Sequence, residues 1–144
     1  MLHTGPLGSA SILKVATNYL AGVHLIATGE ALMVAKRTGI DLAVAYEAIR
    51  ISSGNSLTRE TEGQLILNGS YAVDFTLDLE LKDLVLFQSL AEQHQIPLEL
   101  SPLAVDIVAD ALDQYGPVLG RHKSSNDSKT TATPSWELLD FLKC

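Results

Sequence analysis

The chain has 144 residues, of which 47% are hydrophobic, a formal net charge of -7 at pH 7 and a mean hydropathy of +0.19. A chain of this length suits a single domain with a sizeable core. Its ten Lys and Arg residues are scattered along an acidic chain, which argues against nucleic acid as a partner. No apolar run reaches the ~18 residues of a membrane span, so we expect no membrane association. A single cysteine, Cys144, excludes an internal disulfide and a cysteine-based metal site, and is typical of a cytoplasmic protein.

The first predicted element is one long helix, Ser9–Thr38, which follows a glycine-containing turn and ends at Gly39. Its apolar residues recur at helical spacing, at Leu13, Ala16, Leu20, Val23, Ala27, Ala31 and Val34. About thirty residues would span roughly 45 Å, well beyond the usual ~11–12 residues. We therefore expect several partner helices or a neighbouring subunit along it, with close helix crossings at Gly22 and Gly29.

Two shorter helices are predicted next. Asp41 is a good N-cap for a helix from Leu42 to about Ile51. After a Ser- and Gly-rich turn, Ser56 or Thr58 could cap a third helix that runs to about Leu67 and closes at Asn68-Gly69.

Two more helices complete the predicted domain. The fourth begins at Thr76 or Asp78 and runs to about Gln95, where Ile96-Pro97 stops it. Its inner side is predicted to carry Leu77, Leu81, Leu84, Phe87 (or Gln88) and Ala91. The fifth starts at Ser101-Pro102, with Ser101 as N-cap, reaches Tyr115 and ends at Gly116-Pro117.

The fold class is therefore all-α, a multi-helix domain built on one long N-terminal helix, because no segment alternates like a strand. We expect residues 1–120 to form this domain and residues 121–132 to be a polar linker. Residues 133–144 should form a short helix that packs on the same domain.

Two polar side chains, Lys14 and Asn18, lie four residues apart near the start of the long helix and so share one helix face. A lysine there is commonly just solvated, and Asn is disfavoured inside helices. An amine and an amide fixed side by side on an apolar helix can, however, bind and deprotonate a hydroxyl group.

The chemistry-bearing residues occur in two motifs. The first is Gly5-x-x-Gly8-x-Ala10-x-x-x-Lys14-x-x-x-Asn18, and the second is Lys82-Asp83-Leu84, preceded by Phe75-Thr76-Leu77. Together they resemble the β-hydroxyacid dehydrogenase family, which includes 3-hydroxyisobutyrate dehydrogenase, tartronate semialdehyde reductase and relatives of 6-phosphogluconate dehydrogenase. The family's first motif has glycine where this chain has Ala10, a change that a helix N-terminus tolerates. The resemblance covers roughly residues 3–118.

The resemblance implies the C-terminal helical domain of an NAD(P)-dependent 3-hydroxyacid dehydrogenase, with a fold like that domain of 6-phosphogluconate dehydrogenase. Lys14 would be the catalytic residue that exchanges a proton with the substrate's 3-hydroxyl group, and Asn18 would bind the substrate. Lys82 and Phe75 would lie near the cofactor. A free lysine is neutral only about once in 10³ at pH 7, and burial in a closed cleft would lower its pKa.

The resemblance also implies a second half. The family's NAD- or NADP-binding Rossmann domain precedes this segment, and no βαβ unit with a G-x-G-x-x-G turn occurs here. We expect the isolated chain to be inactive, to hold the catalytic lysine and to form a homo-oligomer, a dimer or tetramer, through its long helix. The substrate would be a small 3-hydroxy acid.

Two other interpretations remain open. One is a stand-alone helical dimerisation module that has kept the fold and lost the chemistry, and the other is an unrelated helical bundle. We predict no metal site, because His3, His24, His94 and His122 lack the spacing of metal ligands.

Overall fold

The computed structural model describes residues 3–68, 70, 72 and 75–117. In chain order these residues form α1 (Ser9–Arg37), α2 (Leu42–Arg50), the π-helical turn η1 (Arg59–Gly63), α3 (Gln64–Leu67), α4 (Leu77–Gln93) and α5 (Leu100–Tyr115). No strand occurs among them, so the predicted all-α class is confirmed for this part of the chain. The expected polar linker (121–132) and terminal helix (133–144) lie outside the described residues.

The long helix α1 has the predicted bounds to within one residue, and glycine conformation sets both of its ends. Gly8, its N-cap, has φ 96°, a left-handed conformation that side chains with a Cβ rarely adopt. At the other end Gly39 has φ 86°, its N–H donates to the Lys36 carbonyl, and the Ile40 N–H donates to the Ala35 carbonyl. This pair of bonds is a Schellman motif, so the chain turns sharply after α1.

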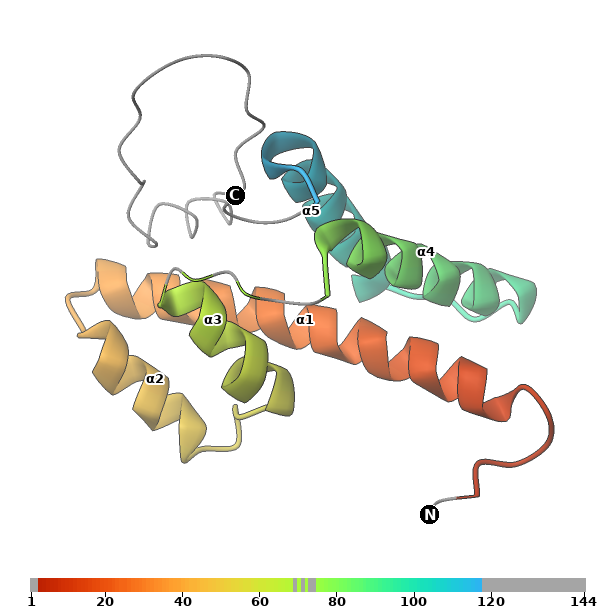
Figure 1. Cartoon of the computed structure of the whole chain (residues 1–144), viewed down its shortest axis with the longest axis horizontal. Helices are drawn as coiled ribbons and strands as arrows, with labels where there is room; N and C mark the ends of the chain where they lie inside the picture. Colours follow the sequence, from red (N-terminus) through yellow and green to blue (C-terminus); the bar gives the residue numbers. More distant parts are fainter. Residues whose placement is uncertain (1–2, 69, 71, 73–74, 118–144) are drawn as a thin grey trace.

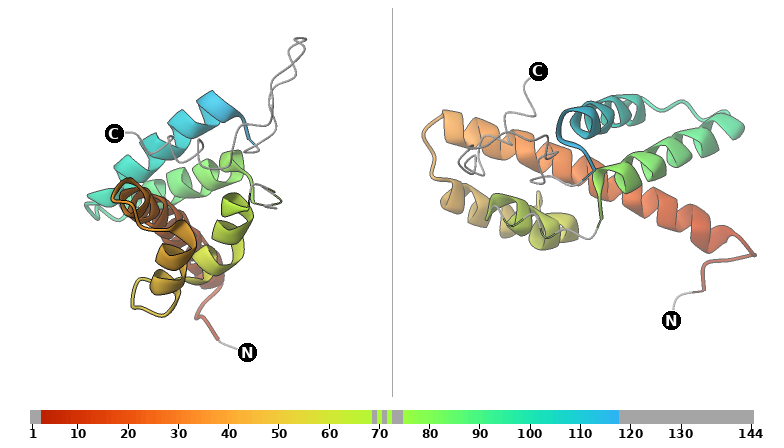
Figure 2. Two further views of the ribbon diagram at one scale, coloured as in Figure 1. Left: turned by 90° about the vertical axis from the view of Figure 1, so that its left-hand side faces the viewer. Right: turned by 45° about the horizontal axis from the view of Figure 1, so that its top comes forward.

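The remaining helices form two groups on different sides of α1 (Figures 1 and 2). Helix α2 folds back beside the C-terminal half of α1, with η1 and α3 next to it. Asp41 caps α2 as predicted, because its side chain accepts from the N–H groups of Ala43 and Val44. Helices α4 and α5 pack on each other and on α1 as the second group.

The core lies where α1, α4 and α5 meet. Leu84, Ala104 and Val108 are buried at its centre, and the half-buried residues Tyr19, Val23, Ile26, Leu77, Leu81 and Val105 pack around them. The rings of Tyr19 and Phe87 stack with centroids 4.2 Å apart, which joins α1 to α4. The predicted inner side of α4 is therefore confirmed, and it fixes α4 against the N-terminal half of α1.

Most of the predicted apolar stripe of α1 does not face this core, although Val23 of that stripe packs against it. Leu13, Leu20 and Val34 are 47%, 50% and 63% exposed, and Ala27 and Ala31 are exposed as well. The buried residues of α1 are Val15, Gly22 and Leu32 instead. An amphipathic pattern shows which residues share a helix face but not which partner covers that face, so the core formed on a neighbouring face.

Two local details differ from the prediction. The third predicted helix has its expected extent, residues 57–67, and the Ser56 hydroxyl caps it by accepting from the Arg59 N–H, but its middle is the π-helical turn η1, a rare form that leaves no recognised sequence signal. Ser101 is not an N-cap, because α5 already begins at Leu100 and the Ser101 side chain is fully buried. Pro102 still fits the first turn, where backbone N–H groups have no helical partner.

By length and composition α1 could cross a membrane, since an 18-residue window of it has a mean hydropathy of 1.2. The core helices of globular proteins pass the same test. In this fold α1 carries Lys14, whose ammonium group pairs with α4, and packing against α4 and α5 accounts for part of its apolar character.

Candidate active site

The two motifs of the sequence meet at one carboxylate. The Lys14 ammonium nitrogen lies 2.7 Å from Asp83 Oδ2, and the Asn18 amide nitrogen donates to the same oxygen over 2.6 Å. Residues separated by more than sixty positions in the chain thus converge where α1 and α4 pack together. The four-residue spacing of Lys14 and Asn18 is what lets both reach a single acceptor.

Asp83 lies at the inner edge of α4, with a side chain only 3% exposed. Its other oxygen, Oδ1, is 3.6 Å from the ammonium nitrogen of Lys82. The side chains of Lys14 and Lys82 are 57% and 63% exposed, so both ammonium groups flank a buried carboxylate while remaining open to solvent. A buried carboxylate with two cations and an amide donor is well satisfied.

Opposing effects act on the pKa of Asp83. Burial disfavours its charged form, but the hydrogen bonds from Lys14 and Asn18, together with the nearby lysine charges, outweigh burial and lower the pKa below its usual value. Asp83 is therefore ionised at neutral pH and can hold Lys14 as an ammonium group.

The predicted site residues are brought together only in part. Lys14, Asn18 and Lys82 share Asp83, whereas Phe75 lies half-buried just before α4 and is not among the polar contacts of Asp83. The burial expected around Lys14 is not supplied by the described residues, because more than half of its side chain is exposed. A cleft closed by another domain would have to provide it.

The sequence motif Lys82-Asp83-Leu84 contains Asp83, but no role was predicted for this residue. Its position indicates partial burial, because it directly precedes Leu84 on the correctly predicted core side of α4. A carboxyl group at the edge of an apolar face needs a partner, but periodicity alone does not identify that partner.

A second carboxyl group, Glu80, lies one turn before Asp83 and is 9% exposed. Burial, followed by the charges of Glu62 and Asp83, raises its pKa to about 7 against the lowering effect of Lys14. Its Oε1 is buried without a hydrogen-bond partner and lies against Gly22 of α1. Sequence reasoning predicted a close crossing at Gly22, which is confirmed, but did not single out Glu80.

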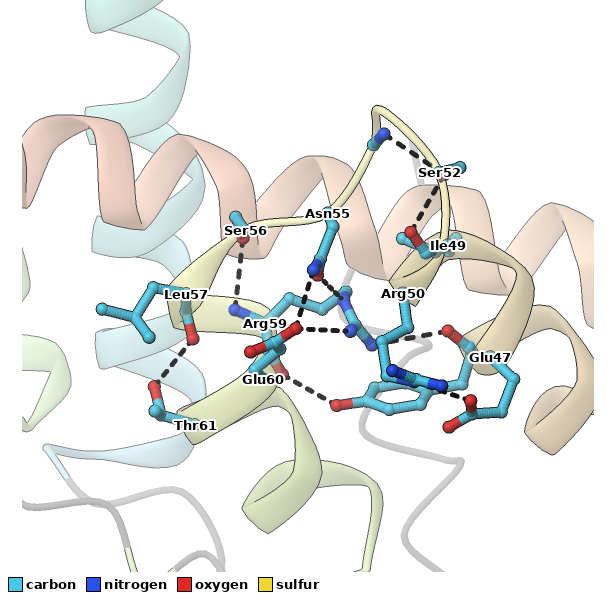
Figure 3. A network of polar contacts seen from close by, with 12 residues as sticks. Glu47, Ile49, Arg50, Ser52, Asn55, Ser56, Leu57, Arg59, Glu60 and Thr61 are labelled. Atoms are coloured by element: carbon cyan, nitrogen blue, oxygen red, sulfur yellow. Dashed lines mark hydrogen bonds and ion pairs between the residues drawn. The ribbon is translucent and has the colours of Figure 1, made fainter.

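A separate polar cluster joins α2 to η1 (Figure 3). The fully buried Arg59 donates from Nε to the Asn55 side chain and from Nη1 to the Tyr46 carbonyl, and its guanidinium carbon lies 4.0 Å from the centre of the Tyr46 ring. The Tyr46 hydroxyl donates to the Arg59 carbonyl. These contacts tie two neighbouring elements together and involve none of the Asp83 partners.

Metal chemistry finds no support in the described ranges. Within residues 3–68, 70, 72 and 75–117, no group of three or more His, Cys, Asp or Glu side chains could hold a metal ion.

Comparison with known proteins places the chain in a family. Residues 8–124 match the family model described as the NAD-binding domain of NADP-dependent 3-hydroxyisobutyrate dehydrogenase. L-threonate dehydrogenase of Escherichia coli K12 is 34% identical over 104 residues, which are 72% of this chain and 34% of that protein.

Two solved structures have a similar fold. A 3-hydroxyisobutyrate dehydrogenase from Salmonella typhimurium matches 78% of this chain and 40% of its own, with a TM-score of 0.70 and 33% identity. The Mycobacterium tuberculosis 3-hydroxyisobutyrate dehydrogenase matches 82% of this chain and 43% of its own, with a TM-score of 0.75. At 23% identity the latter supports the fold alone.

The family match and the all-α fold around the Lys14–Asp83 pair define the class: this chain belongs to the NAD-binding domain family of the 3-hydroxyisobutyrate dehydrogenases, β-hydroxyacid oxidoreductases that use NAD or NADP. The chain spans about a third of the length of the curated relative described above.

Proposed function

We propose that this chain is the helical domain of an NAD(P)-dependent 3-hydroxyacid dehydrogenase and supplies its proton-transfer residue, Lys14. The reaction is the reversible oxidation of a small 3-hydroxy acid to its semialdehyde or oxo acid. The observation that carries this proposal is the convergence of Lys14 and Asn18 on Asp83, which unites the two family motifs at one point.

The reversible reaction needs one group that accepts a proton in the oxidation and donates it in the reduction. In the oxidation, the hydroxyl proton passes to Lys14 Nζ as the C–H electron pair leaves with its hydrogen as hydride. NAD or NADP supplies the hydride acceptor. In the reduction, the Lys14 ammonium returns the proton to the alkoxide oxygen. The contact with Asp83 positions Lys14 Nζ, the atom that accepts the proton in the oxidation and returns it in the reduction.

The residues around Lys14 suit the other half of the site. Beyond its bond to Asp83, the Asn18 amide has one further N–H donor and its carbonyl oxygen, and it would orient substrate oxygens. Lys82, exposed beside Asp83, would place positive charge near the substrate carboxylate or the cofactor. Phe75 at the start of α4 is proposed to contact the cofactor. Exposed cationic and amide donors fit anionic, oxygen-rich ligands.

The whole activity would require a nucleotide-binding domain beside this one. We propose that the described helices pack against such a domain, that the protein is cytoplasmic and that it forms a homo-oligomer through α1. The exposed apolar stripe of α1, which includes Leu13, Leu20 and Val34, supports the oligomer. Turnover of a 3-hydroxy acid by the 144-residue chain alone would contradict the need for a second domain.

The test is a substitution of Lys14 in a two-domain dehydrogenase that carries this domain. Lys14→Met should lower kcat by about 10²–10⁴-fold, because it removes the proton-transfer group while keeping an unbranched side chain. Lys36→Met, in the last turn of the same helix, is the matched control and should leave kcat unchanged.

The second candidate is a stand-alone dimerisation module without chemistry. The exposed stripe of α1 is the observation in its favour. A near-normal rate for Lys14→Met would support this candidate and refute the dehydrogenase role of Lys14.

A further inference from the structure

Two helix faces lie in register where α1 packs on α4. Lys14, Asn18 and Gly22 follow one another at four-residue intervals along α1. On α4, Glu80 and Asp83 are one turn apart, and Asp83 receives Lys14 and Asn18 while Glu80 faces Gly22. The contact of Glu80 with Gly22 therefore lies about one helical turn further along the same α1–α4 interface.

The space beside Gly22 is filled by the Glu80 carboxyl group. A Cβ built on Gly22 would overlap Glu80 Oε1 and come within 3.7 Å of Leu84 Cδ2. Gly22 is buried, and Leu84 is fully buried in the core. The absence of a side chain at this position therefore lets the two helices approach with the carboxyl group between them.

A carboxyl group such as that of Glu80 is unusual in the buried space between two packed helices. Only 9% of the Glu80 surface is exposed, and its Oε1 has no hydrogen-bond partner among the described residues. The charged groups around it are Glu62 of η1, Asp83 of α4 and Lys14 of α1. Two of these three are carboxylates, so the surroundings favour the neutral acid.

We propose that Glu80 is a positioning residue of the candidate active site: its carboxyl group, seated against Gly22, sets the spacing of α1 and α4 at which Lys14 and Asn18 both reach Asp83. The role of Lys14 in proton transfer rests on the proposed function, whereas the spacing itself is a property of this chain. Glu80 acts through Asp83 and Gly22 and touches no substrate.

A dependence on pH follows from this arrangement. An ionised Glu80 would be repelled by Asp83 and Glu62 and would seek water, so it would leave its place against Gly22. The Asn18–Asp83 hydrogen bond should therefore loosen as Glu80 loses its proton. Its pKa of about 7 places this change near neutral pH.

The first experiment is a double-mutant cycle on the full 144-residue chain. Its readout is the side-chain amide of Asn18, followed by NMR as chemical shift and as hydrogen exchange at pH 6. Gly22→Ala should separate the helices and speed exchange about tenfold. Adding Glu80→Ala removes the obstructing carboxyl group and leaves the methyl group added by Gly22→Ala in its place between the helices, so the double variant should return to within about threefold of the unmodified chain.

Gly63→Ala is the matched control, because Gly63 is also a buried helical glycine whose added Cβ would make only ordinary contact, 3.6 Å from Arg59 Cγ. It should leave the Asn18 signal unchanged. If Gly22→Ala leaves Asn18 unaltered, or if Glu80→Ala fails to restore it, the proposed spacing role is wrong.

The second experiment needs no variant at Gly22 and remains decisive if Gly22→Ala does not fold. The Asn18 amide shift should titrate with a midpoint near 7 in the unmodified chain. The titration should vanish in Glu80→Gln, which keeps the shape of the neutral acid, and persist in Asp78→Asn, an exposed change on the same helix. A pH-independent shift, or a titration that survives Glu80→Gln, would overturn the proposal.

The outcome also separates the two proposals. If Asn18 responds as expected but Lys14→Met retains turnover in the two-domain enzyme, the positioning contact stands and the catalytic role of Lys14 fails. If Lys14→Met abolishes turnover but the Asn18 signal does not respond to changes at Glu80, the catalytic role of Lys14 stands and the positioning role of Glu80 fails.

Discussion

At the scale of single residues, Asp83 has the central place in the site. One of its oxygens accepts from both Lys14 and Asn18, and the other faces Lys82. A buried carboxylate in this position orients an amine and an amide more narrowly than solvent would. Glu80, one turn away, has the opposite character, since its surroundings favour the protonated form.

The raised pKa of Glu80 predicts how stability varies with pH. Between its ordinary value of 4.5 and about 7, the unfolded chain releases the Glu80 proton while the folded chain keeps it. The folded state then binds more protons, so the free energy of unfolding falls as pH rises through this window, by about 3 kcal/mol in all. Below pH 4.5 the contribution of Glu80 is fully present.

Urea denaturation of this chain between pH 4.5 and 8 measures the effect. Glu80→Gln should flatten the decline, because glutamine does not ionise, whereas Asp78→Asn should preserve it. If the free energy of unfolding falls equally steeply with pH in the unmodified chain and in Glu80→Gln, the pH dependence does not come from Glu80.

At the scale of elements, different chemistry joins the helices on the two sides of α1. Apolar contacts and the stacked rings of Tyr19 and Phe87 attach α4 to α1. On the other side, the buried guanidinium of Arg59 links η1 to α2 through Tyr46 and Asn55 (Figure 3). The π-helical turn begins at Arg59, so the irregular backbone coincides with this polar link.

Substitution of Arg59 should therefore loosen α2 from η1. Arg59→Ala should lower the free energy of unfolding by about 2–4 kcal/mol, because it removes buried packing and leaves the Asn55 side chain and the Tyr46 carbonyl without their donor. Arg59→Met, which keeps the length of the stem, should cost less. The measurement is thermal or urea unfolding, and a change below about 0.5 kcal/mol for Arg59→Ala would contradict the structural role.

At the scale of the whole molecule, the apolar stripe of α1 remains largely exposed on the described surface. Leu13, Leu20 and Val34 lie along it with exposures of 47–63%. Large apolar side chains that recur along one helix face and remain exposed are typical of an interface. A homo-oligomer built on α1 would cover them.

Sedimentation equilibrium of this chain tests that proposal. The unmodified chain should self-associate, and Leu20→Lys or Val34→Lys should raise the dissociation constant about tenfold or more, because each places a charge in the covered face. Ser11→Lys, at an exposed polar position on the opposite face of the same helix from Leu20, is the matched control. A monomer at all concentrations would leave the stripe to a different partner and contradict the homo-oligomer.

Local chemistry allowed much of this protein to be predicted from its sequence. Periodicity, together with turn and capping residues that act over a few positions, predicted the bounds of α1, the Asp41 cap and the inner face of α4. It also predicted that Lys14 and Asn18 share one helix face.

The tertiary structure alone decided which faces meet. It placed Asp83 against Lys14, seated Glu80 beside Gly22, left the predicted stripe of α1 exposed and buried Ser101 within α5. The physical reason is one of range: helical spacing fixes which residues share a face, whereas contacts between residues more than sixty positions apart depend on how whole helices pack.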